Sequence, residues 1–405
     1  MCEIYNMQEL KVNVGKAVTC HAGARDGYYL SSALNDVNYL EALVTDFYTP
    51  DILRRIIKRR HSAKLPSAKT ISVRSNLLRQ RVLGESFLAT DKILSTKAFE
   101  IARQTKSNLF LTSYTAYEAF RMAKRYCPDM GRLLFQIHPH PLAIRKILTE
   151  ELIAAPEAEF SILAEHEMQV SDDMLARLDG ESQLADNIIV ASSFTQNTLI
   201  DSGVDRDKIT VLPYGVNATK FPHKLNYSDC RNKLRILFLG QMVQRKGLSY
   251  LLKSVKALHS DNIELTIVGR GRFDENLLRE YSACIDFNVV RGLSHKELVK
   301  CFHDHDVMVL PSIIEGFGHV ILEAMSTGIP VICTKNTAGP DLFLTGDEGM
   351  VVPIRDADAI STCIEGLMMT EGKVEFMGRQ AASTARSFSW ERHCEGIRKF
   401  YLANI

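Results

Sequence analysis

The sequence lacks the features that would assign its 405 residues to a metal-binding, disulfide-rich or membrane-spanning class. Its nine cysteines are scattered and form no C-x-x-C pair, so neither a thiolate zinc site nor a disulfide framework is predicted. No run of about 18 uninterrupted apolar residues occurs, which argues against a membrane-spanning helix. The first residues lack the basic-then-apolar pattern of a signal peptide. We therefore expect a cytoplasmic protein.

An excess of one charge sign is also missing, because 49 Lys and Arg balance 48 Asp and Glu to a net charge of +1. No nucleic-acid partner is predicted from this balance. The charge is uneven, however: residues 51–81 contain ten Lys or Arg and one acid, and residues 150–186 contain eleven acids and one Arg. Both runs are expected to be solvated surface. For 51–81 the alternative is a patch for a phosphate-bearing substrate or for peripheral contact with the anionic inner membrane surface.

The length and the pattern of apolar segments predict two α/β domains. Strand-like segments alternate with helical ones in both halves, which indicates doubly wound parallel sheets with helices on both faces. A linker is expected at 218–233, where apolar content is low. We predict an N-terminal domain of residues 1–217 and a C-terminal domain of residues 218–387. Residues 388–405, with a final helix from Trp390 to Leu402, have a length that suits packing back on the first domain.

The stretch from Pro311 to Ile332, PSIIEGFGHVILEAMSTGIPVI, follows a strand and is predicted to continue as a loop and a helix. Ligands bind at the carboxyl ends of strands in such sheets. Gly316 and Gly318 would leave backbone N–H groups at the helix N-terminus available for a phosphate or a sugar hydroxyl. Glu315 and Glu323 are eight residues apart, about two helical turns, so we expect both carboxylates on one face. They could then accept from the vicinal hydroxyls of a ribose or hexose; the alternative is that they are ordinary surface glutamates.

A second predicted loop, Gly240–Gly247, carries two adjacent cations, Arg245 and Lys246, at the start of a helix. Cations there oppose the helix dipole, and a bound diphosphate would relieve the conflict. A third loop contains Gly292 and Leu293, whose backbone could hold the edge of a base.

Two loops of the first half are weaker candidates. His138 and His140 follow a strand and alternate with prolines that fix an extended turn. The strand-end position favours a functional His138, although a structural role for each histidine is an open alternative. Gly23 follows another short strand, where it either lets the backbone approach a ligand or makes a plain turn.

Three motifs together resemble one known family. Gly269-Arg270-Gly271, the Glu315/Glu323 pair within its stretch, and Arg245-Lys246-Gly247 are similar to the retaining glycosyltransferases of family four, which have the GT-B fold of two Rossmann-like domains facing across a cleft. The resemblance covers the second half almost continuously and extends back through residues 187–221, which are similar to the family's domain junction. It fades before about residue 130.

The resemblance implies a metal-independent hexosyltransferase that uses no cofactor. It would move a sugar from a nucleotide diphosphate sugar to a hydroxyl of a saccharide, a lipid-linked or a small acceptor, with retention of configuration. The implied catalytic residues are Glu315, Lys246, Arg245 and His138, the last reaching from the first domain toward the sugar. The implied donor contacts are Lys246, Arg245, Gln241 and Gly23 for the phosphates, Glu315, Gly316, Phe317 and Gly318 for the sugar, Glu323 for the ribose, and Gly292 and Leu293 for the base.

One position departs from the family pattern. Gln241 stands where the family commonly has arginine after the loop's first glycine, and Arg245 is the candidate to supply the missing charge. The alternative functions are a nucleotide-sugar-binding protein without catalysis, a GT-B epimerase and a phosphorylase, the last usually needing a longer chain with a pyridoxal-phosphate lysine. A dehydrogenase is disfavoured, because Gly269-Arg270-Gly271 lacks the third glycine of the dinucleotide fingerprint.

Overall fold

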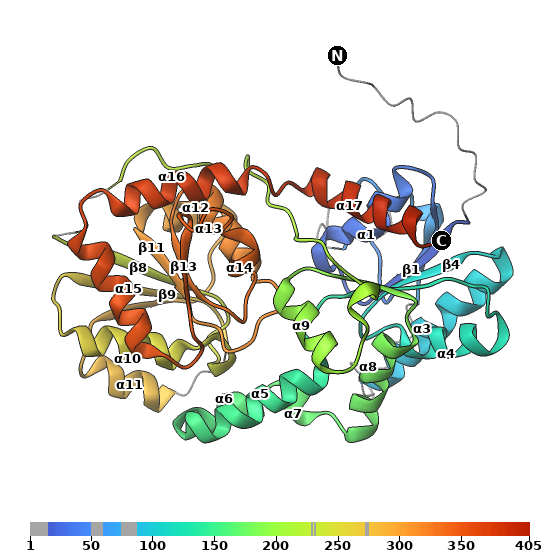
Figure 1. Ribbon diagram of the computed structural model, residues 1–405, viewed down its shortest axis with the longest axis horizontal. Coiled ribbons are helices and arrows are strands. Elements are labelled where there is room, and N and C mark those ends of the chain that lie inside the picture. The colour runs from blue at the N-terminus through green and yellow to red at the C-terminus, as the bar shows by residue number, and fades with distance from the viewer. Residues whose placement is uncertain (1–14, 50–59, 74–86, 228–229, 231, 272–274) are drawn as a thin grey trace, which may run out of the picture. The chain divides into compact units, whose positions relative to one another are not determined.

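The structure is a computed structural model that describes residues 15–49, 60–73, 87–227, 230, 232–271 and 275–405 (Figure 1). These residues form two compact units. The first contains the chain up to Phe135, Gly180–Ile189 and Cys394–Ile405; the second contains Gln136–Asp179 and Val190–His393. Most of the basic run, residues 51–59 and 74–81, and the basic helix expected at 51–58 lie outside the described residues.

The first sheet has seven strands in the order β3-β2-β1-β4-β5-β6-β7. Its strands are β1 (Ala17–His21), β2 (Leu40–Thr45), β3 (Thr70–Ser72), β4 (Asn108–Thr112), β5 (Arg132–Gln136), β6 (Asn187–Val190) and β7 (Ile209–Val211). The central pairs are parallel, with Val18 beside Ala42 on one side and Leu109 on the other. The apolar side chains of β1 and β4 are buried, as expected for a strand covered on both faces.

The helices of the first unit include α1 (Tyr29–Asn35), α3 (Phe87–Thr105), α4 (Tyr117–Tyr126), the end of α8 (Asp172–Leu184) and most of α17 (Trp390–Ala403). The last helix is held by Tyr401, whose ring stacks on Phe110 with centroids 6.3 Å apart. Its hydroxyl donates to the carbonyl of Gly15 at 2.5 Å. The predicted return of the C-terminal helix to the first domain is therefore confirmed.

The second sheet has six strands in the order β10-β9-β8-β11-β12-β13, the strand order of a Rossmann fold. They are β8 (Leu234–Leu239), β9 (Ile263–Val268), β10 (Phe287–Val290), β11 (Val307–Leu310), β12 (Val331–Thr334) and β13 (Gly349–Val352). The helices are α10 (Leu248–Leu258), α11 (Glu275–Ser282), α12 (His295–Asp304), α13 (His319–Thr327), α14 (Gly339–Leu342), α15 (Ala357–Met369) and α16 (Lys373–Ala385). Helices α12, α13 and α16 lie on one face, and α10, α11 and α15 on the other (Figure 1).

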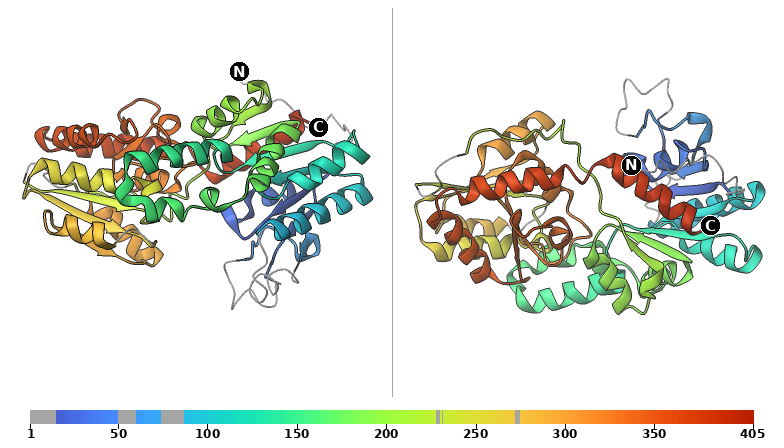
Figure 2. Two further views of the ribbon diagram at one scale, coloured as in Figure 1. Left: turned by 90° about the horizontal axis from the view of Figure 1, so that it is seen from below. Right: turned by 45° about the horizontal axis from the view of Figure 1, so that its top comes forward.

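The second unit also carries α5 (Pro141–Ala154), α6 (Glu159–Leu163), α7 (His166–Gln169) and α9 (Ser193–Asp201). Ile144, Leu148 and Ile162 form a buried cluster with Ile314, which follows β11. Figures 1 and 2 show α5 and α6 on the side of α10, and Lys253 of α10 pairs with Glu157 between these two helices. Because of this packing, the predicted domain boundary at residue 217 falls inside the second unit.

Two sequence-based expectations are wrong. The single helix expected from Ser161 to Leu178 is broken into α6, α7 and α8, because Glu165 and Val170 both have extended backbones. The segment expected as a long connection before the last helix contains β13, α15 and α16. The prediction of two doubly wound α/β sheets is confirmed. None of the helices in the described ranges is long and apolar enough to cross a membrane.

Candidate functional site

The loops that follow β8 and β11 meet at the switch point of the second sheet, where the strand order reverses. The amide of Ile313 donates to the carbonyl of Arg245 at 2.8 Å. Gly247 has a φ of +71°, and a Cβ at this position would lie 1.9 Å from the carbonyl oxygen of Pro311. A side chain cannot fit between the loops, so glycine is required for their close contact.

Lys246 is the buried cation of this junction. Its amine forms an ion pair with the carboxylate of Glu315, and the two side chains are 12% and 17% exposed. Burial and, secondarily, the charge of Arg245 lower the pKa of Lys246 to about 7. A lysine held in this way exchanges its proton near neutral pH and gains from any anion that enters.

Arg245 extends along the same junction and contacts four groups. Its Nε lies 3.1 Å from Glu165 Oε2, and Nη1 donates to the Ile314 carbonyl at 3.2 Å. Its Nη2 donates to Gln241 Oε1 at 3.3 Å, and Nη1 lies 3.6 Å from Glu315 Oε2. The guanidinium therefore lies beside Gln241.

The loop with Gly316 is held from its other side by the start of α9. The carbonyl of Gly316 accepts from Ser192 Oγ at 2.6 Å and from Thr195 Oγ1 at 3.2 Å. A Cβ on Gly316 would lie 2.6 Å from the carbonyl of Ile137 and 3.5 Å from the Cα of His138. The structure thus brings the backbone of His138 next to the loop, and both belong to the second unit rather than to separate domains.

Glu315 and Glu323 are not related by two helical turns, contrary to the argument from their spacing. Gly318 is left-handed, with a φ of +83°, and α13 begins only at His319. Glu315 therefore lies in the loop, where its amide donates to the Asn336 carbonyl at 3.0 Å. Glu323 lies within α13, and its burial raises the pKa of its carboxyl.

Aromatic side chains surround the start of α13. Phe317 lies edge-on to Tyr214 at 5.1 Å between ring centroids, and His319 lies 4.5 Å from Tyr214. His319 also stacks on Trp390 at 5.9 Å. His393 completes this aromatic cluster, 5.1 Å from Tyr214 and 5.6 Å from Trp390. The cluster surrounds the start of α13 with large, rigid side chains.

The loops after β9 and β10 lie next to that of β8. The amide of Met242 donates to the carbonyl of Arg270 at 2.9 Å, and a Cβ on Gly269 would lie 1.8 Å from the Gly240 carbonyl. Gly292 has a φ of +83°, and a Cβ there would lie 2.7 Å from a guanidinium nitrogen of Arg270. The exposed Gly292 and half-buried Leu293 thus lie at the edge of the same group of loops.

Gly23 belongs to the first unit and follows β1. Its φ is +79°, and a Cβ there would have nothing within 4 Å. Its amide donates to Asp46 Oδ1 at 2.9 Å, and Asp46 also pairs with Arg60 at 2.7 Å. These contacts outweigh the effect of burial and lower the pKa of Asp46. The glycine faces open space, but its amide is already bonded.

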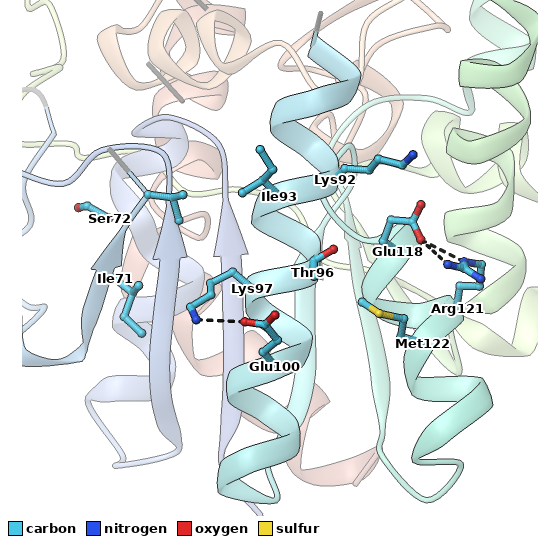
Figure 3. A pocket seen from close by; sticks show the side chains of 11 residues that line it. Ile71, Ser72, Lys92, Ile93, Thr96, Lys97, Glu100, Glu118, Arg121 and Met122 are labelled. Atoms are coloured by element: carbon cyan, nitrogen blue, oxygen red, sulfur yellow. Dashed lines mark hydrogen bonds and ion pairs between the residues drawn. The ribbon is translucent and has the colours of Figure 1, made fainter. Parts of the chain in front are cut away.

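The first unit also has a groove of about 740 Å³ between β3, α3 and α4 (Figure 3). Ile71, Ile93 and Met122 contribute apolar surface, and four of the five charged side chains pair with one another, Lys97 with Glu100 and Arg121 with Glu118. The described residues that line this groove include none of the predicted site residues. It is a separate feature.

Sequence reasoning missed several groups that hold the site. Glu165, Ser192 and Asn336 contact the predicted residues, but in the sequence they carry no motif. Ser192 has a local signal only as a helix cap, because serine is a preferred N-cap residue, and it accepts from the amide of Thr195 at 3.1 Å. Its second contact, to Gly316, joins segments 124 residues apart and has no local signal. Among the described residues no group of His, Cys, Asp and Glu could hold a metal ion.

Comparison with known proteins matches part of the chain to a family. Residues 233–370 match the model of the glycosyl transferases group 1 family. The chain is 30% identical over 251 residues to the D-inositol 3-phosphate glycosyltransferase of Arthrobacter sp. (strain FB24), which is 56% of this chain and 59% of the relative. It is also 30% identical to the capsular polysaccharide biosynthesis glycosyltransferase CapM of Staphylococcus aureus, over 54% of this chain and 61% of CapM. The chain thus spans less than two thirds of the length of these relatives.

Solved structures show the same fold over nearly the whole chain. The sucrose-phosphate synthase of Thermosynechococcus elongatus is 18% identical with a TM-score of 0.71, covering 96% of this chain and 98% of that one. Anabaena HepE, solved in complex with UDP-glucose, is 14% identical with a TM-score of 0.62, covering 96% of this chain and all of HepE. The predicted GT-B fold is therefore confirmed.

Proposed function

We propose that the protein transfers a sugar from a nucleotide diphosphate sugar to a hydroxyl acceptor, with retention of configuration. The observation that carries the proposal is the junction of Lys246, Arg245 and Glu315 at the switch point of the second sheet. Two cations and a carboxylate in a largely buried site match a donor that has both a diphosphate and sugar hydroxyls. The match of residues 233–370 to the glycosyl transferases group 1 family supports this reading.

In the proposed complex, the diphosphate lies against Lys246 and Arg245 and replaces Glu315 as the partner of the lysine. The released carboxylate of Glu315 and the amides of Gly316–Gly318 then hold the sugar. Glu323 takes the ribose and His138 the sugar. The remaining donor contacts are Gln241 and Gly23 for the phosphates and Gly292 and Leu293 for the base.

The reaction breaks the bond between the anomeric carbon and the diphosphate oxygen. The acceptor oxygen bonds to the same face of that carbon, and its proton passes to the departing diphosphate. Negative charge grows on the diphosphate as the bond breaks, and Lys246 and Arg245 are placed to stabilise it. We propose that these cations do so without a metal ion; turnover that disappears with EDTA and returns with Mg²⁺ would contradict this.

Incubation with a panel of nucleotide sugars tests catalysis and identifies the donor together. We expect slow hydrolysis of one donor without acceptor, and loss of that hydrolysis in Lys246→Ala. Lys253→Ala is the matched control, because Lys253 is a cation of α10 that pairs with Glu157 outside the loop. Hydrolysis of no donor, despite nucleotide binding, would favour the alternative of a binding protein. Gln241 in place of arginine supports that alternative, since it weakens leaving-group stabilisation.

The basic run at 51–81 is a separate proposal, a peripheral contact with anionic membrane. It predicts that the protein sediments with anionic liposomes at low salt and is released at high salt, because screening weakens surface charge interactions. Absence of binding at low salt would exclude the contact.

A further inference from the structure

The acidic run of residues 150–186 is not simply a solvated surface. Four of its acids pair with three cations of residues 218–387. Glu150 and Glu151 lie 3.4 and 2.7 Å from Arg355, Glu157 lies 2.7 Å from Lys253, and Glu165 lies 3.1 Å from Arg245. Of the three cations, Arg245 is the one in the proposed donor site. Glu165 is thus the acid of this run that pairs with a cation of the proposed donor site.

The segment holds the residue next to Arg245 as well. The amide of Gln244 donates to Ser161 Oγ at 2.8 Å, and its side-chain Nε2 donates to Glu151 Oε1 at 2.7 Å. Ser161, Glu151 and Gln244 are fully buried. The backbone that carries Arg245 is therefore fixed by α5 and α6, so the position of its guanidinium depends on side-chain torsions alone.

Glu165 sets those torsions. It stands between α6 and α7 with an extended backbone, φ −69° and ψ 144°, at a break in what the sequence predicts as one helix. Its carboxylate binds Nε of Arg245, and the two side chains are 15% and 21% exposed. With Nε held, the Nη atoms lie against Gln241 and the Ile314 carbonyl.

We propose that Glu165 is a positioning residue for the donor diphosphate. This role rests on the proposed function. Glu165 holds the guanidinium of Arg245 beside Gln241, so that Arg245 supplies the positive charge that glutamine lacks. A flexible arginine loses side-chain entropy when it binds an anion, and a preformed contact at Nε removes much of that cost. The Nη atoms keep N–H groups that a phosphate can accept from.

Glu165 also opposes anion binding through its own charge. Two substitutions separate the effects: Glu165→Gln keeps an acceptor for Nε and removes the charge, whereas Glu165→Ala removes both. Glu157→Ala is the matched control, because it removes an acid of the same segment whose partner, Lys253, lies outside the loop.

The test is calorimetric titration of each variant with UDP and with inorganic pyrophosphate. We expect Glu165→Ala to weaken the binding of both ligands by about tenfold, since the guanidinium of Arg245, and with it the charge-assisted contact to the phosphates, is no longer ordered. Glu165→Gln should bind both at least as tightly as the wild type, and Glu157→Ala within about twofold of it. A merely structural role for Glu165 would not be rescued by glutamine.

Other outcomes overturn the proposal. Affinities of Glu165→Ala equal to or above those of the wild type would show that Arg245 needs no positioning. Weaker binding by Glu165→Gln would overturn the proposal even if Glu165→Ala does not fold, because it would show that an acceptor for Nε is not what Glu165 contributes. Pyrophosphate carries no nucleoside, so titration with it distinguishes failure of the Glu165 proposal from failure of the proposed function. Wild-type protein that binds pyrophosphate but no nucleoside diphosphate contradicts the proposed function, while wild-type protein that binds neither contradicts both.

Discussion

At the residue scale, Lys246 links the charge of the site to pH. Burial and Arg245 lower its pKa from 10.5 to about 7 in the folded protein, so between these values the unfolded chain binds the extra proton. The contribution of this residue to the free energy of unfolding therefore rises with pH across that window, because folding releases this proton and the release costs less at higher pH. A bound diphosphate has the opposite effect on the pKa, since a nearby anion favours the charged lysine.

We predict that UDP binding at pH 8 takes up about one proton, and that affinity falls as the pH rises from 7 to 9. Titration calorimetry in Tris and in HEPES measures the uptake, because the ionisation enthalpies of the two buffers differ and neither buffer supplies phosphate to the site. Lys246→Arg should abolish it, since arginine stays charged throughout. Equal heats for the wild type in both buffers would show that Lys246 does not titrate with the ligand.

Glu323 is proposed to recognise the ribose, not the phosphates. Glu323→Ala should therefore weaken the binding of UDP by roughly 1–3 kcal/mol, the range for a lost charged hydrogen bond. The affinity for pyrophosphate should not change. Calorimetric titration with both ligands checks this. An equal loss for the two would mean that the substitution disturbs α13 as a whole, and an unchanged UDP affinity would remove Glu323 from the site.

At the element scale, the loop between β11 and α13 depends on close backbone contact. A Cβ on Gly316 would lie 2.6 Å from the carbonyl of Ile137, which belongs to a segment far away in sequence. We expect Gly316→Ala to lower the free energy of unfolding by about 1–3 kcal/mol, the usual cost of overpacking.

Urea unfolding measures this loss. Gly366→Ala is the control, because Gly366 lies within α15 and a Cβ there meets only the flexible end of Lys373. Alanine in a helix interior should stabilise by about 0.5–1 kcal/mol. A neutral Gly316→Ala would mean that residues 137 and 316 separate at little cost.

The same elements show which parts of the structure could be predicted from the sequence. Continuous apolar runs such as Val307–Leu310 predicted buried parallel strands, and these are confirmed. The eight-residue spacing of Glu315 and Glu323 led to a wrong prediction, because Gly318 has a left-handed backbone and the helix begins only after it. Even α15 had a local signal that was overlooked, since Asp356 accepts from the amide of Ala359 as its cap.

The contacts between residues that are far apart in the sequence could not be predicted from local patterns. Glu165 and Arg245 are 80 residues apart, and Ser192 and Gly316 are 124 apart. Each such pair consists of common polar residues without a motif, and which residues meet is decided by how the elements pack. The chemistry of the predicted residues was visible in the sequence, whereas the groups that position them depend on the tertiary fold.

At the scale of the whole molecule, the aromatic cluster joins three distant parts of the chain. Tyr214 follows β7, Phe317 and His319 flank the start of α13, and Trp390 and His393 open α17. Helix α17 begins in the second unit and belongs to the first from Cys394 onward. The rings at the start of this helix therefore contact the residues that flank the start of α13.

Trp390 is the single tryptophan of the chain, so intrinsic indole fluorescence reports on this cluster alone. We predict that saturating UDP changes the emission of Trp390, because the ligand orders the loop at Phe317 and His319, whose ring lies 5.9 Å from the indole. Trp390→Phe should remove the signal while binding remains measurable by calorimetry. The dissociation constant from fluorescence should equal the calorimetric one. Unchanged emission at a UDP concentration that calorimetry shows to be saturating would mean that the loop is already ordered without ligand, and that the cluster holds it there.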